Sequence, residues 1–187
     1  MVLRRASLPQ EPEVVLQGNR VGDAQHRPHL RLCHLEIGKG EILREGDGEV
    51  AILAYGSMVY PSMQAAENLS KDGVQATVVN ARFVKPLDAD LILASAEKHG
   101  LIVTVEEAYL AGGFGSAVME LLEANDVQDK VKVVRMGVAD EIVTHGDPKG
   151  LLSKYGLNPD GIATRVSTTL TEMNEGKVNK RRLKAVK

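Results

Sequence analysis

Two adjacent carboxylates, Glu106 and Glu107, are the residues of this chain with the clearest chemical potential. They follow the apolar run 101–105 and precede a glycine-rich turn at 112–116. Carboxylates at the carboxyl end of a buried strand can position a substrate, bind Mg²⁺ or transfer a proton. Neighbouring residues of a strand point to opposite faces, however, so the two do not form one paired site. We therefore favour a structural interpretation, in which one carboxylate caps backbone N–H groups or meets a neighbouring domain and the other faces solvent.

The turn Gly112-Gly113-Phe114-Gly115-Ser116 admits two interpretations. Glycines let a backbone approach an anion, and the helix that follows offers free N–H groups, so the turn is a candidate phosphate site. It lacks, however, the GK[ST] ending of a P-loop and the GxGxxG order of a dinucleotide fingerprint. We favour a tight turn that lets strand and helix pack closely, with Phe114 as an anchor and Gly113 as a candidate contact residue.

Three further residues are candidates for contacts with an anion or with a neighbouring domain. Arg82 and Lys85 follow a predicted strand and suit an anionic group, although pairing with Asp88 or Glu106 explains them equally well. His145 lies in a loop before a helix cap, where titratable residues are common whether or not they act in catalysis. The single cysteine, Cys33, has no base or metal-ligand companion at a recognisable spacing.

Composition excludes several functional classes. The chain has 187 residues, of which 43% are hydrophobic and 26% charged, as in a globular domain. A formal charge of −2 gives no reason to expect nucleic acid as a partner. No apolar run approaches the roughly 20 residues needed to span a bilayer. One cysteine excludes an internal disulfide framework, and we expect a cytoplasmic protein.

Strand and helix signals alternate from residue 36 onward, which predicts an α/β fold with a mostly parallel twisted sheet and helices on both faces. The expected strands are 49–55, 75–80, 101–105 and 131–136. The expected helices are 58–71, 88–99, 116–125, 148–155 and 162–172. We divide the chain into an irregular N-terminal segment (1–35), the α/β domain (36–172) and a basic tail (173–187). No Ser-His-Asp set, H-E-x-x-H motif or cysteine pair appears.

Five stretches together resemble the C-terminal domain of thiamine-diphosphate enzymes of the transketolase type, and among these the 1-deoxy-D-xylulose-5-phosphate synthase family. The stretches are residues 36–40, 53–58, 80–88, 103–116 and 137–146. The Val-Glu-Glu and Gly-Gly elements are shared with transketolase and with the E1β subunits of 2-oxo-acid dehydrogenases. The Gly-Lys-Gly at 38–40 and the Arg-Phe-x-Lys-Pro-Leu-Asp at 82–88 favour the synthase.

The resemblance implies a transketolase C-terminal-like domain of three α/β/α layers. Such enzymes condense pyruvate with glyceraldehyde 3-phosphate on thiamine diphosphate, a step in isoprenoid and thiamine precursor synthesis. In the family, the cofactor and Mg²⁺ lie between the first two domains, so we expect none to be bound by this chain alone. Gly46-Asp47-Gly48 repeats part of the metal motif but lacks its downstream asparagine, and we interpret it as a turn. The segment 14–17 does not supply the arginine with which the family binds the substrate phosphate, so no catalytic residue is carried across.

Three hypotheses of function follow. The first is a C-terminal domain fragment, inactive alone, that serves domain packing and the dimer organisation of the full enzyme. Its partners would be the N-terminal and middle domains, without nucleic acid or membrane. The second is an E1β-like subunit that works with a separate chain. The third is a small anion-binding α/β module that uses Arg82, the turn at 112–116 and His145.

Overall fold

A five-stranded sheet forms the centre of the domain that begins at Gly38. The computed structural model describes residues 35–185, with side chains up to residue 176, so the predicted N-terminal segment lies outside the described residues except for Leu35. The strand order is β1-β3-β2-β4-β5, with β1 antiparallel to β3 and the other pairs parallel. The strands are β1 (Glu41–Arg44), β2 (Val50–Ala54), β3 (Thr77–Asn80), β4 (Leu101–Tyr109) and β5 (Lys132–Val138).

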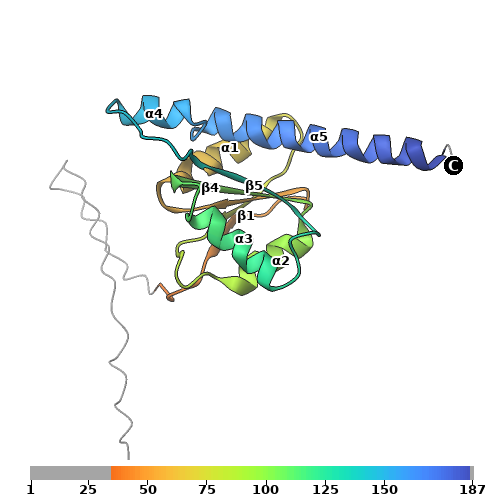
Figure 1. Ribbon diagram of the computed structural model, residues 1–187, viewed down its shortest axis with the longest axis horizontal. Coiled ribbons are helices and arrows are strands. Elements are labelled where there is room, and N and C mark those ends of the chain that lie inside the picture. The colour runs from red at the N-terminus through yellow and green to blue at the C-terminus, as the bar shows by residue number, and fades with distance from the viewer. Residues whose placement is uncertain (1–34, 186–187) are drawn as a thin grey trace, which may run out of the picture. The chain divides into compact units, whose positions relative to one another are not determined.

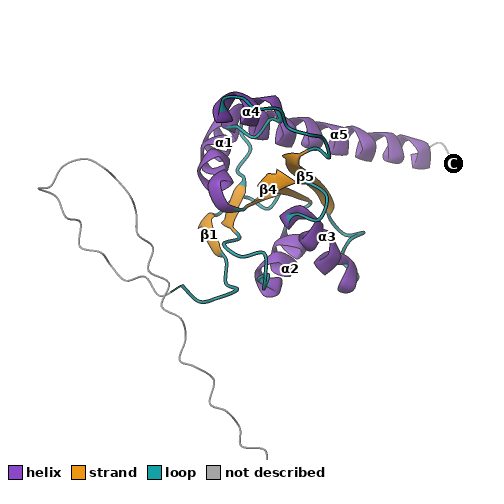
Figure 2. Cartoon of the chain, turned by 60° about the vertical axis from the view of Figure 1, so that its left-hand side comes forward, coloured by secondary structure: helices purple, strands orange, loops and turns teal. Residues whose placement is uncertain are grey.

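Helices cover both faces of this sheet (Figures 1 and 2). Buried side chains of α1 and α5 belong to one hydrophobic cluster, and those of α2 and α3 to the other. The predicted α/β class, with a mostly parallel sheet covered on both faces, is confirmed. The helices are η1 (Gly56–Met58), α1 (Val59–Lys71), α2 (Ala89–Lys98), α3 (Phe114–Ala124), α4 (Pro148–Lys154) and α5 (Pro159–Ala185). No helix in this described part is long and apolar enough to cross a membrane.

The central strand β2 explains why the core has two halves. All five of its residues are buried, and successive side chains point to opposite faces. Val50 and Ile52 join the cluster under α1 and α5, whereas Ala51 and Leu53 join the one under α2 and α3. A strand buried on both faces is apolar throughout, as the run at 50–54 is.

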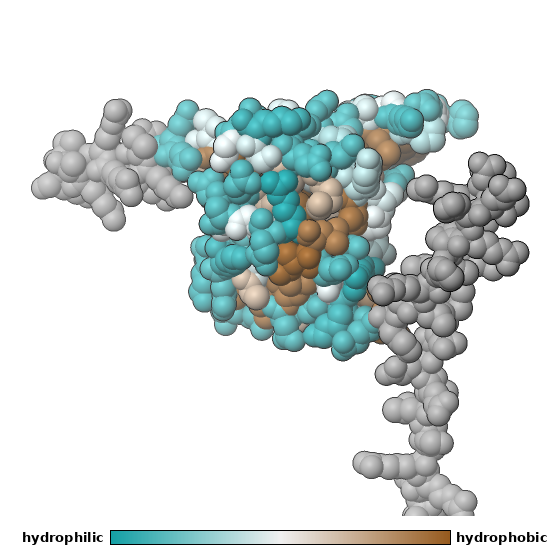
Figure 3. Space-filling view, turned by 180° about the vertical axis from the view of Figure 1, so that it is seen from behind, coloured by the Kyte–Doolittle hydropathy of each residue, from teal (hydrophilic) through white to brown (hydrophobic). Residues whose placement is uncertain are grey.

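The strand β1 is missing from the predicted elements. It has only four residues, with charges at both ends, and it pairs with β3 through an irregular register between Ile42 and Arg44. Ile42 and Leu43 are 43% and 37% exposed at this edge of the sheet. Apolar side chains gather on the side of the molecule turned away from the viewer in Figure 1, where β1 lies (Figure 3). Short length, charged ends and a bulge are features that limit pairing of an edge strand with another chain.

The last helix begins earlier and ends later than predicted. The side chain of Asn158 accepts a hydrogen bond from the N–H of Gly161 at 2.7 Å, so the predicted turn at 158–161 is instead the start of α5. Proline fits the first helical position, which Pro159 occupies. α5 then continues to Ala185 and includes most of the predicted basic tail (173–187).

The carboxyl ends of the parallel strands lie together and carry the loops with the candidate residues. The N–H of Tyr55 donates to the carbonyl of Val105 at 2.9 Å, which joins the ends of β2 and β4. The N–H of Leu110 donates to the carbonyl of Val138 at 2.9 Å, which joins the ends of β4 and β5. This edge therefore brings together the turn after β2, the carboxylates of β4 and the loop after β5.

Candidate functional site

The carboxylate of Glu106 lies inside the domain and binds the start of α3. Its side chain is 1% exposed, and its two oxygens accept hydrogen bonds from the N–H of Phe114 at 2.7 Å and the N–H of Gly115 at 2.8 Å. The first N–H groups of a helix have no partner within the helix, and the positive end of its dipole favours an anion. The capping interpretation is thus confirmed for Glu106.

The same contacts explain why α3 begins at Phe114, two residues before the predicted start at Ser116. No side chain of the local N-cap residue, Gly113, can cap the helix, and Glu106 takes over from the preceding strand. A Cβ atom on Gly113 would collide with Oε2 of Glu106 and with the carbonyl of Tyr109. Glycine at 113 therefore serves the close approach of strand and helix.

These contacts also count against a phosphate site in the turn. The N–H groups of Phe114 and Gly115 would have to bind the anion, but they are already bound by a buried carboxylate. The hydroxyl of Ser116 accepts from the N–H of Gly112 at 3.1 Å and donates to the carbonyl of Leu110 at 2.8 Å. The turn is thus closed by its own hydrogen bonds.

Glu107, in contrast, is exposed, and the Ser57 hydroxyl donates to its carboxylate. The two glutamates therefore point into different environments, as expected for neighbours on a strand. Close by, the ring of Tyr55 stacks on Phe114 with centroids 5.7 Å apart. Ser57 was not singled out by the sequence, because a serine after a glycine is a common turn residue.

Arg82 pairs with neither of its two expected partners. Its guanidinium forms an ion pair with Glu41 of β1, and not with Asp88 or Glu106. The backbone of Arg82 has a φ of +57°, and its N–H donates to the side-chain oxygen of Asn80 at 3.1 Å. Lys85 is exposed in the loop after β3. The structure thus places Arg82 in a local, charge-paired environment at the β1 edge.

Asp88 also has a structural role. Its carboxylate accepts from the N–H of Leu91 at 3.2 Å, which caps α2, and from the N–H of Gly40 at 2.9 Å. Lys39 lies 3.6 Å from the Asp88 carboxylate and 3.4 Å from that of Asp90. The Gly-Lys-Gly and Lys-Pro-Leu-Asp motifs therefore contact each other and fasten the segment before β1 to the start of α2.

His145 is exposed in the loop between β5 and α4, two residues before Asp147. Asp147 caps α4 by accepting from the N–H of Gly150 at 2.8 Å. Among the described residues, the structure does not bring Arg82 or Glu106 into contact with His145; each of those two side chains is bound elsewhere.

Three residues tie the loop after β5 to α4. The Tyr155 hydroxyl donates to Oε1 of Glu141 at 2.5 Å, Lys154 donates to the same oxygen at 3.2 Å, and the Lys154 ammonium lies 5.1 Å from the centre of the Tyr155 ring. The hydrogen bond from Tyr155, followed by that from Lys154, lowers the pKa of Glu141 from its ordinary value. The Glu141 carboxylate in turn raises the pKa of Tyr155 and that of Lys154.

Next to this cluster, Ile142 is 95% exposed. Tyr60, in the first turn of α1, is 71% exposed, and Tyr109, at the end of β4, is 49% exposed. Sequence reasoning missed these residues. The available signal was an isoleucine next to charged residues in the segment 139–147, which lies outside the predicted strands and helices.

The described residues do not fit a magnesium-diphosphate group. In the part of the chain from 35 to 185, no three His, Cys, Asp or Glu side chains are placed to hold a metal ion. The helix N-terminus beside the glycine-rich turn is occupied by Glu106. We therefore derive no chemical step through thiamine diphosphate in this chain.

Comparison with known proteins defines the class. The family model "Transketolase, C-terminal domain" matches residues 38–162. The chain belongs to the family of transketolase C-terminal domains. Among solved structures, this chain is similar to a split-gene transketolase described as an inactive β4 tetramer. The two superpose with a TM-score of 0.68 and are 37% identical, and the match covers 74% of this chain and 44% of the other. A transketolase from Pichia stipitis, at 19% identity and a TM-score of 0.52, shares the fold.

Within this class, the predicted resemblance to 1-deoxy-D-xylulose-5-phosphate synthase is confirmed. The synthase of Synechococcus sp. (strain JA-2-3B'a(2-13)) is 58% identical over 132 residues, which are 71% of this chain and 20% of that protein. The synthase of Symbiobacterium thermophilum is 48% identical over 184 residues, covering 86% of this chain and 28% of that protein. The chain thus spans only about a fifth to a quarter of the length of these relatives.

Proposed function

We propose that this chain is the C-terminal domain of a 1-deoxy-D-xylulose-5-phosphate synthase and acts by docking onto the other domains of that enzyme. The observation that carries the proposal is 58% identity to such a synthase over a stretch that makes up 20% of the relative. The match thus leaves about four fifths of the relative's length unaligned with this chain. Alone, the chain would be inactive in the condensation of pyruvate with glyceraldehyde 3-phosphate.

Thiamine diphosphate, with Mg²⁺, would be held by the other domains and would supply the carbanion chemistry of the reaction there. The contribution of this domain would be packing and the dimer organisation of the whole enzyme, in the cytoplasm. The roles found for Glu106 and Asp88 support a domain of this kind, since both carboxylates are used to hold its own helices.

The carboxyl edge of the sheet is the face best suited to docking. It presents Ile142, whose side chain is 95% exposed, with Tyr60 and Tyr109 on neighbouring elements. Glu141 holds the loop that carries Ile142 through its bonds to Tyr155 and Lys154. An exposed apolar side chain on a loop already fixed in place costs little conformational entropy when a partner covers it.

A two-chain enzyme is the second candidate. It is favoured by the 37% identity to the split-gene transketolase, which is described as an inactive β4 tetramer. In that case the partner would be a separate polypeptide carrying the cofactor site. The third hypothesis, an anion-binding module, is disfavoured because Glu106 occupies the N–H groups of the glycine-rich turn.

The test is reconstitution. The full 187-residue chain is mixed with the N-terminal and middle domains of the Synechococcus synthase, produced as a separate polypeptide, and deoxyxylulose phosphate is measured. We expect product from the mixture, a stable complex in size-exclusion chromatography, and no product from the chain alone. Formation of product by the chain alone would show that the chain is active by itself. The absence of both a complex and product in the mixture would disprove docking. Capture of a different separate chain from the native host, with activity only in that pair, would favour the two-chain enzyme.

A further inference from the structure

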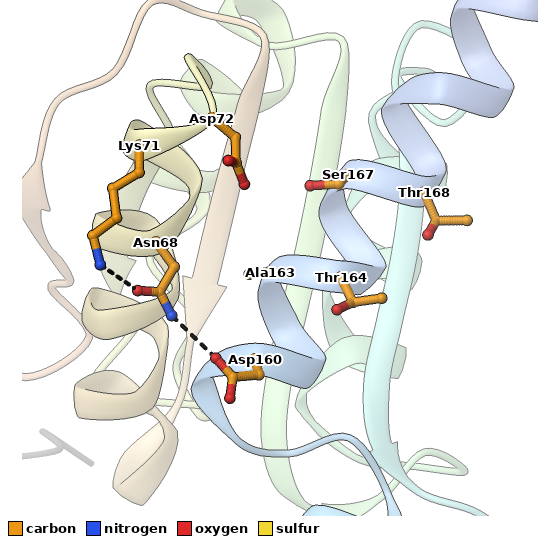
Figure 4. A pocket seen from close by; sticks show the side chains of 8 residues that line it. All are labelled: Asn68, Lys71, Asp72, Asp160, Ala163, Thr164, Ser167 and Thr168. Carbon is orange, nitrogen blue, oxygen red and sulfur yellow. Dashed lines mark hydrogen bonds between the residues drawn. The ribbon is translucent and has the colours of Figure 1, made fainter.

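A groove of about 530 Å³ lies between α1 and α5 (Figure 4). It is open to solvent along the surface of the two helices, and seven of its eight lining residues have polar or charged side chains, although the surface they present is polar and apolar in similar parts. The lining residues are Asn68, Lys71 and Asp72 of the α1 end, and Asp160, Ala163, Thr164, Ser167 and Thr168 of α5.

One side of the groove is ordered by a chain of hydrogen bonds. The Lys71 ammonium donates to the side-chain oxygen of Asn68 at 3.0 Å, and the Asn68 amide nitrogen donates to Oδ1 of Asp160 at 3.2 Å. This chain sets the orientation of the Asn68 amide, since its oxygen meets a donor and its nitrogen an acceptor. It leaves the second oxygen of Asp160 available at the groove.

The other side is a strip of hydroxyl groups on α5. Thr164, Ser167 and Thr168 are spaced at i, i+3 and i+4, which places them on one face of the helix. Their hydroxyls make no hydrogen bond within the described part of the chain. On the same helix, the hydroxyls of Thr169 and Thr171 instead donate to backbone carbonyls one turn earlier, at 2.8 and 2.9 Å. The three groove hydroxyls therefore keep their capacity to donate to and accept from a ligand.

The charges of the lining indicate the class of ligand. Lys71 carries a positive charge, and Asp72 and Asp160 carry negative charges, so both signs meet in the same groove. A ligand with a strong net charge of either sign would face repulsion from one of these groups. No aromatic ring lines the groove, and Ala163 is its single apolar side chain. The lining side chains both donate and accept hydrogen bonds, so they suit a ligand whose own groups do the same.

We propose that the α1–α5 groove binds a small neutral polyol, such as a free sugar or a cyclitol. The hydroxyls of Thr164, Ser167 and Thr168 would bond to the ligand hydroxyls, and the carboxylates of Asp72 and Asp160 would accept from them. We expect a Kd of about 1–10 mM. This is the affinity of a ligand with about a dozen heavy atoms for an open groove that has no aromatic ring to stack on. This site is independent of the docking role proposed above.

The experiment is a titration of the full ¹⁵N-labelled chain, followed by amide NMR shifts, with myo-inositol, D-xylose, spermidine and inorganic phosphate as separate probes. Saturable shifts with the polyols, confined to residues of 68–72 and 160–168, are expected. Saturable shifts there with spermidine or phosphate alone would overturn the neutral-polyol assignment. The absence of saturable shifts with either polyol up to 50 times the upper expected Kd, about 500 mM, would overturn the site itself.

Variants separate the groove from the rest of α5. The double variant Thr164→Val, Ser167→Ala removes two groove hydroxyls, and we expect the polyol Kd to rise at least fivefold. Thr171→Val removes a hydroxyl that is bonded to the backbone outside the groove, and Thr164→Ser keeps the hydroxyl, so both should bind as the parent does. Equal affinity in the double variant, with unchanged thermal unfolding, would contradict the proposal. If the double variant is less stable, the comparison of Thr164→Ser with Thr164→Val decides, because only the second should weaken binding.

Discussion

The carboxylate of Glu106 and the backbone of Gly113 lie so close that no side chain fits at position 113. Glu106 ends the buried part of β4, and its oxygens hold the first N–H groups of α3. The pair of motifs that invites a catalytic interpretation in the sequence is thus one structural unit. A buried anion is stabilised by the end of a helix, and a glycine gives it room.

Replacing Glu106 by glutamine should destabilise the domain. An amide oxygen can accept from one of the two N–H groups, but the amide nitrogen cannot accept from the other. An unsatisfied buried donor and the loss of a charge at the helix start together cost about 2–4 kcal/mol. Urea unfolding of Glu106→Gln measures this cost. Glu107→Gln is the matched control, since the neighbouring carboxylate is exposed and should change stability by less than about 0.5 kcal/mol. Equal effects of the two substitutions would contradict the assigned role.

Gly113 and Gly112 should respond differently to alanine. Alanine at 113 puts a Cβ against Glu106 and the carbonyl of Tyr109, and we expect a loss of about 2–4 kcal/mol in unfolding free energy. Gly112 has a φ of +72° and open space around it, so Gly112→Ala carries only the left-handed backbone penalty of about 1–2 kcal/mol. A smaller loss at 113 than at 112 would show that the strand and helix can separate without cost.

A second buried polar chain connects Thr77 and His99. The N–H of Gly46 donates to the Thr77 hydroxyl oxygen at 3.0 Å, so the Thr77 hydroxyl is free to donate to Nε2 of His99 at 2.8 Å. Nδ1 of His99 then carries the proton and donates to the carbonyl of Ser95 at 2.9 Å. This network joins the start of β3, the end of α2 and the turn before β2.

Thr77→Val keeps the shape of this side chain but leaves two groups without a partner, the buried Nε2 of His99 and the half-buried N–H of Gly46. We expect a loss of about 2–3 kcal/mol, measured by urea unfolding. Thr169→Val is the matched control, because Thr169 is equally buried but its hydroxyl bonds only to its own helix. It should cost less than about 1 kcal/mol. An unchanged free energy of unfolding in Thr77→Val would contradict the proposed direction of these hydrogen bonds.

The Glu141 cluster should depend on pH in a defined direction. The pKa of Glu141 is lowered from 4.5, chiefly by the Tyr155 hydrogen bond, so its contribution is present above pH 4.5 and is lost as the pH falls through the lower folded value. The pKa of Tyr155 is raised from 10.0, and its contribution is lost as the pH rises through the higher folded value. The loop should therefore be held to α4 between these limits.

NMR titration of the carboxyl carbons tests this cluster. In Tyr155→Phe, the pKa of Glu141 should move back toward 4.5, because the largest cause of its shift is removed. Glu45 serves as an internal control, since its pKa is lowered by Lys98, whose ammonium lies 2.7 Å away in a separate ion pair. A change at Glu45 equal to that at Glu141 would indicate a general effect on the domain.

The order of strands and helices could be predicted because each buried segment shows its own period and its own glycine or proline boundaries. β2 is apolar along its whole length, and α2 starts at the local cap Asp88. β1 could not be predicted, because four residues with charged ends carry no period, and its strand conformation depends on pairing with β3. The start of α3 was missed since its cap, Glu106, is eight residues away from the N–H of Phe114.

For the candidate contact residues, too, only part of the site could be predicted. Their residue types and their positions after strands follow from the sequence, but the partner of each side chain does not. Arg82 binds Glu41 of the unpredicted strand, and Ser57 binds Glu107 across the ends of β2 and β4. Such pairings depend on the strand order β1-β3-β2-β4, which periodicity does not give.

Ile142 should be the residue whose replacement weakens docking most. Its side chain is 95% exposed on a fixed loop, so burial against a partner removes apolar surface from water worth about 1.5–3 kcal/mol. In the mixture with the N-terminal and middle domains, Ile142→Gln should raise the dissociation constant by about 10–100-fold. Met119→Gln, on the exposed side of α3, and Ile42→Gln, on β1, carry the same change at other exposed apolar positions and should bind as the parent does.

Loss of binding in Ile42→Gln with normal binding in Ile142→Gln would place the docking face at the β1 edge instead, where the apolar patch of Figure 3 lies. Equal affinity in all three variants would exclude both surfaces, because the exposed isoleucine side chains would then stay in water in the complex.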